Sequence, residues 1–145
     1  MIPAEDFDQA IEASHRALDE IARGNPGAFF ELYSRQDDAT LANPYGPPAR
    51  GWNQIQDAGR RAASNYRDGK ALGFENFARC VTEELGYILE IERFEAKVAG
   101  GDEVSPVALR VTSIFHREEG TWRLLHRHAD PITTLRPGDS VIQTS

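Results

Sequence analysis

Three stretches of sequence decide the fold: GYILEIERFEAKV at residues 86–98, VALRVTSIFHR at residues 107–117 and TWRLLHRHAD at residues 121–130. Each stretch is rich in aliphatic, β-branched and aromatic residues. Turn sequences separate them, with Gly100-Gly101-Asp102 after the first and Glu118-Glu119-Gly120 after the second. This pattern predicts consecutive antiparallel strands. Residues 74–83 predict one further, less regular strand, which holds Cys80 as a half-buried residue.

Helical periodicity dominates the first half of the chain. Apolar residues spaced by three and four from Phe7 to Ile21 predict a helix that ends near Gly24. A short aromatic helix is expected over 27–34, a short strand over 37–44, a loop at 45–48 and a third helix over 51–69. Helices followed by strands indicate an α+β fold. We therefore expect a single domain over residues 1–145, with a core at 5–132 and a tail at 133–145, in which three or four helices pack on a curved antiparallel sheet.

Composition excludes several classes of protein. The formal charge of −7 disfavours nucleic acid as a partner, because an acidic chain repels phosphate groups. The single cysteine excludes an intramolecular disulfide bond, as is usual in a reducing compartment. The first residues lack the pattern of a secretion signal, and no apolar stretch is long enough to span a membrane. We expect a cytoplasmic protein that binds neither nucleic acid nor membrane.

The strands mix charged and apolar residues on the same face. Alternation in an extended strand places Trp122, Leu124, His126, His128 and Asp130 together. The same rule groups Arg110 with Thr112, and Glu90 and Glu92 with Ile88 and Phe94. A partly enclosed cavity with apolar walls and a few polar groups explains this mixture, because ligand sites have that composition. We expect these polar residues to converge on one small-molecule pocket.

Each candidate site residue has a functional and a structural interpretation. His128 and Asp130 predict a proton-transfer pair, with His126 beside them, or a hydrogen-bonded pair that closes the end of the sheet. Arg110 and Glu92 predict either a structural ion pair or a site in which Arg110 holds a ligand oxygen. Tyr45, Trp52 and Tyr66 are predicted either to line the pocket or simply to pack in the core. Asn43 is predicted to be a hydrogen-bonding pocket residue or, alternatively, a turn cap before Pro44. The two histidines could hold a metal with Glu90, Glu92 or Asp130 as third ligand, but nothing requires this, and we expect neither a metal nor an organic cofactor.

Two segments carry a family resemblance. Residues 37–46, DDATLANPYG, and residues 109–131, which include REEGTWRLLHRHADP, resemble the SnoaL-like branch of the nuclear transport factor 2-like superfamily, which includes ketosteroid isomerase relatives. The resemblance implies a cone-shaped α+β barrel with a pocket between sheet and helices. It also implies a homodimer formed through the outer face of the sheet, which would carry Arg123, Leu125 and Arg127. It does not imply one reaction, because this superfamily hosts both enzymes and binding modules.

The sequence departs from the ketosteroid isomerase pattern at three positions. That enzyme uses an Asp base and an oxyanion hole of a Tyr and a protonated Asp. Alignment places Asn43 at the base, Ala17 near the tyrosine and Thr112 near the oxyanion Asp. An amide cannot accept a proton at neutral pH and alanine offers no donor, so isomerisation by the family mechanism is not expected.

Two functions remain open. One is a cofactor-free isomerase, cyclase or dehydratase that acts on a small, oxygenated, partly apolar substrate, with His128 and Asp130 moving the proton and Arg110 holding negative charge. The other is a non-catalytic ligand-binding or dimeric association domain, which the absence of the family base favours.

Overall fold

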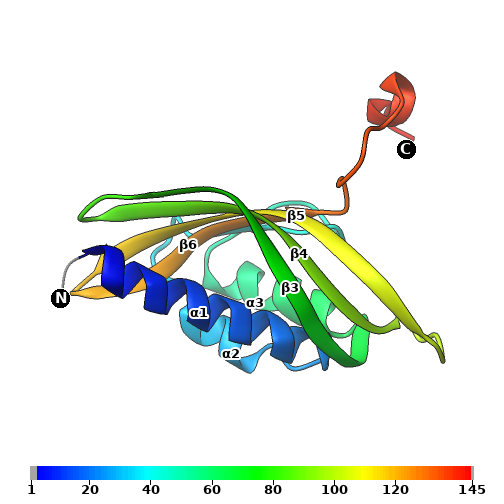
Figure 1. Ribbon diagram of the computed structural model, residues 1–145, viewed down its shortest axis with the longest axis horizontal. Helices are drawn as coiled ribbons and strands as arrows, with labels where there is room; N and C mark the ends of the chain where they lie inside the picture. The colour runs from blue at the N-terminus through cyan, green and yellow to red at the C-terminus, as the bar shows by residue number, and fades with distance from the viewer. Residues whose placement is uncertain (1–2, 145) are drawn as a thin grey trace.

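Three helices cover one face of a six-stranded sheet in the computed structural model of the protein (Figure 1). The structure describes residues 3–144, with side chains from residue 6, so residues 1, 2 and 145 of the expected domain lie outside it. The elements, in chain order, are α1 (Pro3–Ala22), α2 (Gly27–Leu32), β1 (Thr40–Ala42), β2 (Ala49–Arg50), α3 (Trp52–Ala63), β3 (Tyr66–Val81), β4 (Leu85–Val98), β5 (Val104–Glu118), β6 (Thr121–Asp130) and the short 3₁₀ helix η1 (Gly138–Val141).

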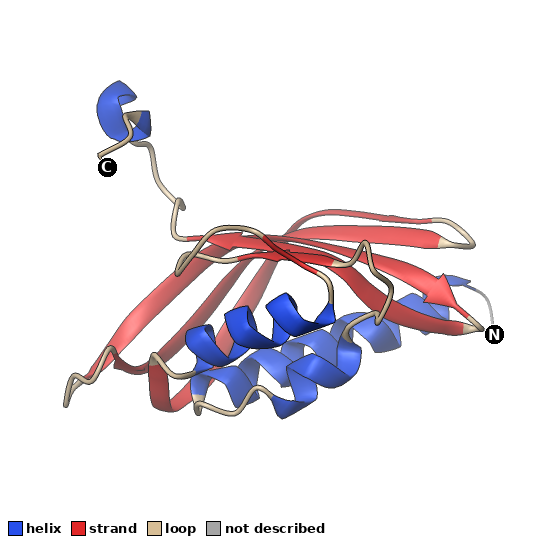
Figure 2. Cartoon of the chain, turned by 180° about the vertical axis from the view of Figure 1, so that it is seen from behind, coloured by secondary structure: helices blue, strands red, loops and turns tan. Residues whose placement is uncertain are grey.

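The sheet has the strand order β2-β1-β6-β5-β4-β3. The long strands β3 to β6 form the predicted antiparallel meander, and β1 joins its edge in parallel with β6. The sheet is therefore mixed rather than wholly antiparallel. It curves over the helices without closing, and residues after β6 lead away from the body of the domain (Figures 1 and 2). The α+β cone fold expected from the sequence is confirmed.

Aromatic and aliphatic side chains fill the space between helices and sheet. Phe7 of α1 is fully buried, and its ring lies 5.3 Å from that of Phe115 and 5.2 Å from that of Trp122. Further along α1, Leu18 and Ile21 are also buried, which confirms the amphipathic pattern. The helix ends where Gly24 adopts a φ of 90°, a left-handed conformation that favours glycine. No helix in the described part of the chain is long and apolar enough to cross a membrane.

The boundary between α3 and β3 differs from the prediction. The third helix ends at Ala63, and the expected helical residues 66–69 instead begin β3, which pairs with the far end of β4. Gly69 permits this pairing, because a Cβ there would lie 2.2 Å from the carbonyl oxygen of Glu95. Cys80 lies later in β3 and is exposed rather than half-buried.

A bulge in β6 changes which side chains face the helices. Ile114 pairs with His126 and Phe115 pairs with Leu124, so Leu125 is an extra residue without a partner on β5. Alternation restarts after Leu125. Trp122 and Leu124 face the helices before the bulge, but Arg127 and Ala129 face them after it.

The predicted faces of β6 are therefore wrong beyond Leu124. His126, His128 and Asp130 lie on the outer face of the sheet and not with Trp122 and Leu124. Arg127 does not lie on the outer face with Arg123, as the family resemblance implied, but inside the cone.

Candidate functional site

A cavity of about 50 Å³ lies between the helices and the inner face of the sheet. Its wall is mostly apolar, and every element except β2 and the 3₁₀ helix η1 contributes to it. The apolar side chains on the wall are Leu18, Ile21, Phe29, Leu32, Leu41, Pro44, Ala62, Phe94, Leu109, Leu124 and Ala129. The polar residues on the wall are Ser14, Asn43, Tyr45, Tyr66, Ser113 and Arg127. Apolar walls with a few placed polar groups are a composition that small-molecule sites share.

Two tyrosines form a hydrogen-bonded pair on the wall. The Tyr45 hydroxyl donates to the Tyr66 hydroxyl at 2.8 Å, and the Tyr66 ring packs edge-on against Phe94 at 5.0 Å. Burial strongly raises the pKa of Tyr66, and the neighbouring Tyr45 adds to this effect. Tyr66 is therefore a neutral phenol at physiological pH and can donate a hydrogen bond into the cavity.

Asn43 lies at the end of β1, where the base of ketosteroid isomerase was aligned. Its side-chain oxygen accepts a hydrogen bond from the backbone N–H of Tyr45 at 2.9 Å, as the turn-cap interpretation expects. Its side-chain nitrogen donates to the carbonyl of Ala58 at 3.4 Å. Asn43 therefore caps the turn and positions Tyr45, and it also lines the cavity.

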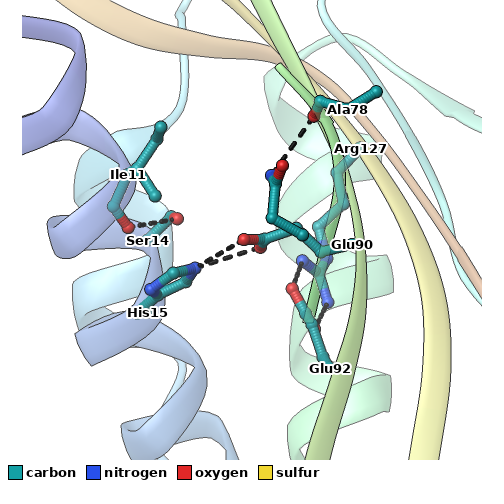
Figure 3. Close-up of polar contacts among 8 residues, drawn as sticks. Ile11, Ser14, His15, Ala78, Glu90, Glu92 and Arg127 are labelled. Carbon is teal, nitrogen blue, oxygen red and sulfur yellow. Dashed lines mark hydrogen bonds and ion pairs between the residues drawn. The ribbon is translucent and has the colours of Figure 1, made fainter. Parts of the chain in front are cut away.

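Arg127 is the one charged residue among the described residues that line the cavity. Its two terminal nitrogens donate to the two carboxylate oxygens of Glu92, each at 2.8 Å (Figure 3). The Arg127 side chain is 11% exposed and that of Glu92 is 5% exposed. Burial alone would lower the pKa of Arg127, but the charge and hydrogen bonds of Glu92 outweigh it and raise that pKa. The result is a buried, bidentate and electrically neutral pair.

A second buried carboxylate lies one pleat away on β4. Glu90 is 3% exposed, and both of its oxygens lie within 3.1 Å of Nε2 of His15 on α1 (Figure 3). The His15 ring stacks on Phe74 with 3.6 Å between ring centroids. This pair joins α1 to the sheet beside the cavity without lining it.

The outer face of the sheet holds a separate polar group. The Arg110 guanidinium makes two hydrogen bonds to Asp130, at 3.1 and 2.7 Å, and His128 lies 3.2 Å from the same carboxylate. Burial would raise the pKa of Asp130, but its bonds to Arg110 and to the backbone N–H of Ile132 lower it overall. His126 lies 2.8 Å from the Thr40 hydroxyl, and burial together with the charge of His128 lowers its pKa.

The structure thus divides the predicted site residues between two faces. Asn43, Tyr45 and Tyr66 line the cavity, and Glu92 lies behind Arg127. The expected contact between His128 and Asp130 is present, but on the outer face. The predicted pair of Arg110 and Glu92 is wrong: Arg110 lies opposite Ile91 on the neighbouring strand, so its side chain and that of Glu92 point to opposite faces.

Two further predicted wall residues lie elsewhere. Thr112 lies on the outer face, opposite His128. Trp52, at the start of α3, stacks beneath the Arg35 guanidinium at 3.4 Å and packs on Phe30, outside the cavity. Sequence reasoning missed Arg127, Ser113 and Ser14 as wall residues. The sequence signal for Arg127 was the adjacent pair Leu124-Leu125, which marks a break in alternation.

Among the residues whose side chains the structure describes, 6–144, no group of three or more His, Cys, Asp or Glu residues is suited to a metal ion. His126 and His128, the two histidines that could in principle chelate a metal, are engaged separately with Thr40 and Asp130.

Solved structures share this fold at low sequence identity. A protein of the NTF2-like family from Streptomyces avermitilis, proposed to be a dehydratase, is 18% identical with a TM-score of 0.72, over 90% of this chain and 96% of that one. A ketosteroid isomerase-like protein from Erwinia carotovora atroseptica is 15% identical with a TM-score of 0.67, over 92% and 95% of the two chains. A proposed calcium/calmodulin-dependent protein kinase type II association domain from Thiobacillus denitrificans is 19% identical with a TM-score of 0.68, over 87% and 94%. At these identities the likeness concerns the fold alone.

No curated protein matches the sequence. The model of the SnoaL-like domain family, in contrast, matches residues 8–133, which include most of α1, the whole of α2 and α3, and all six strands. The chain belongs to the SnoaL-like domain family.

Proposed function

We propose that the protein binds a small, largely apolar molecule that carries an oxygen atom, with the hydrocarbon part in the cone and the oxygen near Tyr66. The observation that carries this proposal is the wall itself, in which apolar side chains surround a few hydrogen-bond donors. Because a buried water occupies about 10–15 Å³ on the same measure, the 50 Å³ cavity accepts a molecule of only about four or five heavy atoms without rearrangement.

Binding is a better match to this wall than proton-transfer catalysis. An isomerase or dehydratase needs a group in the cavity that accepts a proton from the substrate. None of the described residues on the wall is Asp, Glu or His, and the nearest buried carboxylate, Glu92, is held by Arg127. The expected catalytic pair of His128 and Asp130 points away from the cavity.

The proposal is tested with butan-2-one, a ketone of five heavy atoms. Its binding is followed by the amide chemical shifts of the protein in NMR titrations. Saturable shifts should concentrate on wall residues such as Leu41 and Ala129. The variant Ala62→Leu, which fills the cavity from α3, should lose them, whereas Ala13→Leu, a half-buried helical alanine away from the wall, should keep them. Equal binding by both variants, or no saturable shift in the original protein, would reject the proposal.

A cofactor-free enzyme is the second candidate, favoured by the neutral phenol of Tyr66, which could polarise a carbonyl group as an oxyanion donor does. The same ketone separates the two candidates. An enzyme that enolises carbonyl compounds would catalyse exchange of the C3 protons of butan-2-one with deuterium oxide, at a rate proportional to protein concentration. We expect exchange at the rate of buffer alone.

We also propose that a second copy of the chain covers the outer face of the sheet. Phe77 and Tyr87 are 61% and 42% exposed on that face, and Leu89 and Ile91 lie between them and Arg110. Covering Phe77 and Tyr87 in a homodimer removes apolar surface from water. Light scattering should report a dimer, and Phe77→Lys combined with Tyr87→Lys should yield a monomer. A dimer that survives both charges would place the interface elsewhere.

A further inference from the structure

Glu92 has no position on the cavity wall, yet it determines the charge of that wall. Arg127 reaches the wall from β6, and Glu92 holds the guanidinium from behind with two hydrogen bonds of 2.8 Å. Both side chains are almost fully buried. A ligand in the cavity therefore meets a cation whose charge is already balanced by a carboxylate a few ångströms further away.

A carboxylate ligand would gain little from this arrangement. Leaving water is costly for an anion, and only a net positive charge or several new hydrogen bonds could offset that cost. At Arg127 the ligand would compete with Glu92 for the same donors, and the two carboxylates would repel each other. A ketone avoids these costs, because it enters the cavity uncharged and can accept a hydrogen bond from the Tyr66 phenol.

We propose that Glu92 is a specificity-determining residue that, by neutralising Arg127, makes the cavity select neutral carbonyl compounds over carboxylates. This inference rests on the proposed small-molecule function. It assigns to that site a ligand class, ketones and related neutral hydrogen-bond acceptors, and it identifies the residue that excludes the anionic alternative.

Three probes of five heavy atoms test the selection: butan-2-one, the anion propionate and the hydrocarbon 2-methylbut-1-ene. The unmodified protein should bind the ketone at least tenfold more tightly than propionate, and more tightly than the hydrocarbon. In Glu92→Gln the side chain keeps its size but loses its charge, so Arg127 becomes an unbalanced cation. The ratio of the two affinities should then invert, with propionate binding more tightly than butan-2-one.

Two further variants isolate the charge of the pair. Glu95→Gln removes a carboxylate from a position of β4 that faces away from the cavity, and it should leave the ratio unchanged. The double variant Glu92→Gln with Arg127→Met is neutral and should prefer the ketone. If Glu92→Gln is partly unfolded, sodium propionate should raise its melting temperature by several degrees, whereas equal sodium chloride should not.

The outcomes separate this inference from the function on which it rests. If no probe gives saturable shifts in the original protein, the small-molecule function itself fails. If the ketone binds but propionate binds equally well, or if Glu92→Gln leaves the ratio of affinities unchanged, the cavity is real and the role assigned to Glu92 is wrong.

Discussion

The buried pair of Glu92 and Arg127 should be strongly cooperative in stability, and a double-mutant cycle measures this. The side chains are 5% and 11% exposed and share two hydrogen bonds of 2.8 Å. Replacing either residue by Met leaves the other charge buried without its partner, which costs about 3–5 kcal/mol. Replacing both removes the two charges together, and such exchanges are often neutral. The double variant should therefore lie within about 1 kcal/mol of the original protein.

Urea unfolding followed by circular dichroism measures the free energy of unfolding for the four proteins of this cycle. A matched surface pair provides the control. Arg110 and Asp130 are also bidentate, but the Arg110 side chain is 49% exposed, so Arg110→Met should cost no more than about 1 kcal/mol. The reasoning fails if the single variants at Glu92 and Arg127 also cost less than about 1 kcal/mol, or if their losses simply add in the double variant.

Three other perturbations test the fold around the site. Gly69→Ala would place a Cβ 2.2 and 2.6 Å from two backbone oxygens, so the free energy of unfolding should fall by about 3 kcal/mol or more. The control Gly73→Ala meets no atom within 4 Å and should change the free energy of unfolding by less than about 0.5 kcal/mol. Because folding lowers the pKa of His126, this imidazole binds a proton more readily in the unfolded chain, and stability should fall as the pH drops below 6.5. Urea unfolding at a series of pH values should show a shallower fall for His126→Asn. Asp130 has a lowered pKa, so its contribution to the free energy of unfolding is present above pH 3.8 and disappears as the pH falls through the pKa of Asp130 in the folded state. Arg110→Gln should raise the pKa of Asp130 in a carboxyl NMR titration, and an unchanged pKa would contradict the role assigned to the guanidinium.

Sequence patterns were sufficient to predict the fold where pairing between strands is regular. β4 and β5 pair without interruption from Leu85 to Lys97, so simple alternation correctly placed Glu90 and Glu92 on the same buried face as Ile88 and Phe94. The amphipathic pattern of α1 and the turn sequences before β5 and β6 were equally direct. In these segments local periodicity and tertiary packing agree.

The candidate site was only partly predictable, because two irregularities of the strands determine which residues line the cavity. The bulge at Leu125 moves Arg127 into the cone and His128 out of it, and the adjacent pair Leu124-Leu125 signals a break in alternation without showing which residue is left unpaired. The early start of β3 was also hidden, because Arg67-Asp68-Gly69 has the composition of a turn. Tyr66 was nevertheless predicted to line the pocket, since a large aromatic residue at that point of the chain is buried in either element.

The division between the two faces also bears on which function the cone can perform. His126, whose pKa burial lowers, lies on the outer face with His128, whereas the described cavity wall offers a neutralised Arg127 and a phenol with a strongly raised pKa. A catalyst of proton transfer needs a group that gains and loses a proton under working conditions. A binding site benefits from the opposite property, because a wall of constant charge keeps its affinity constant as the pH changes. The bulge at Leu125 therefore does more than alter one strand: it places Arg127 on the cavity wall and leaves His126, His128 and Asp130 outside it, and this arrangement favours recognition over proton-transfer catalysis.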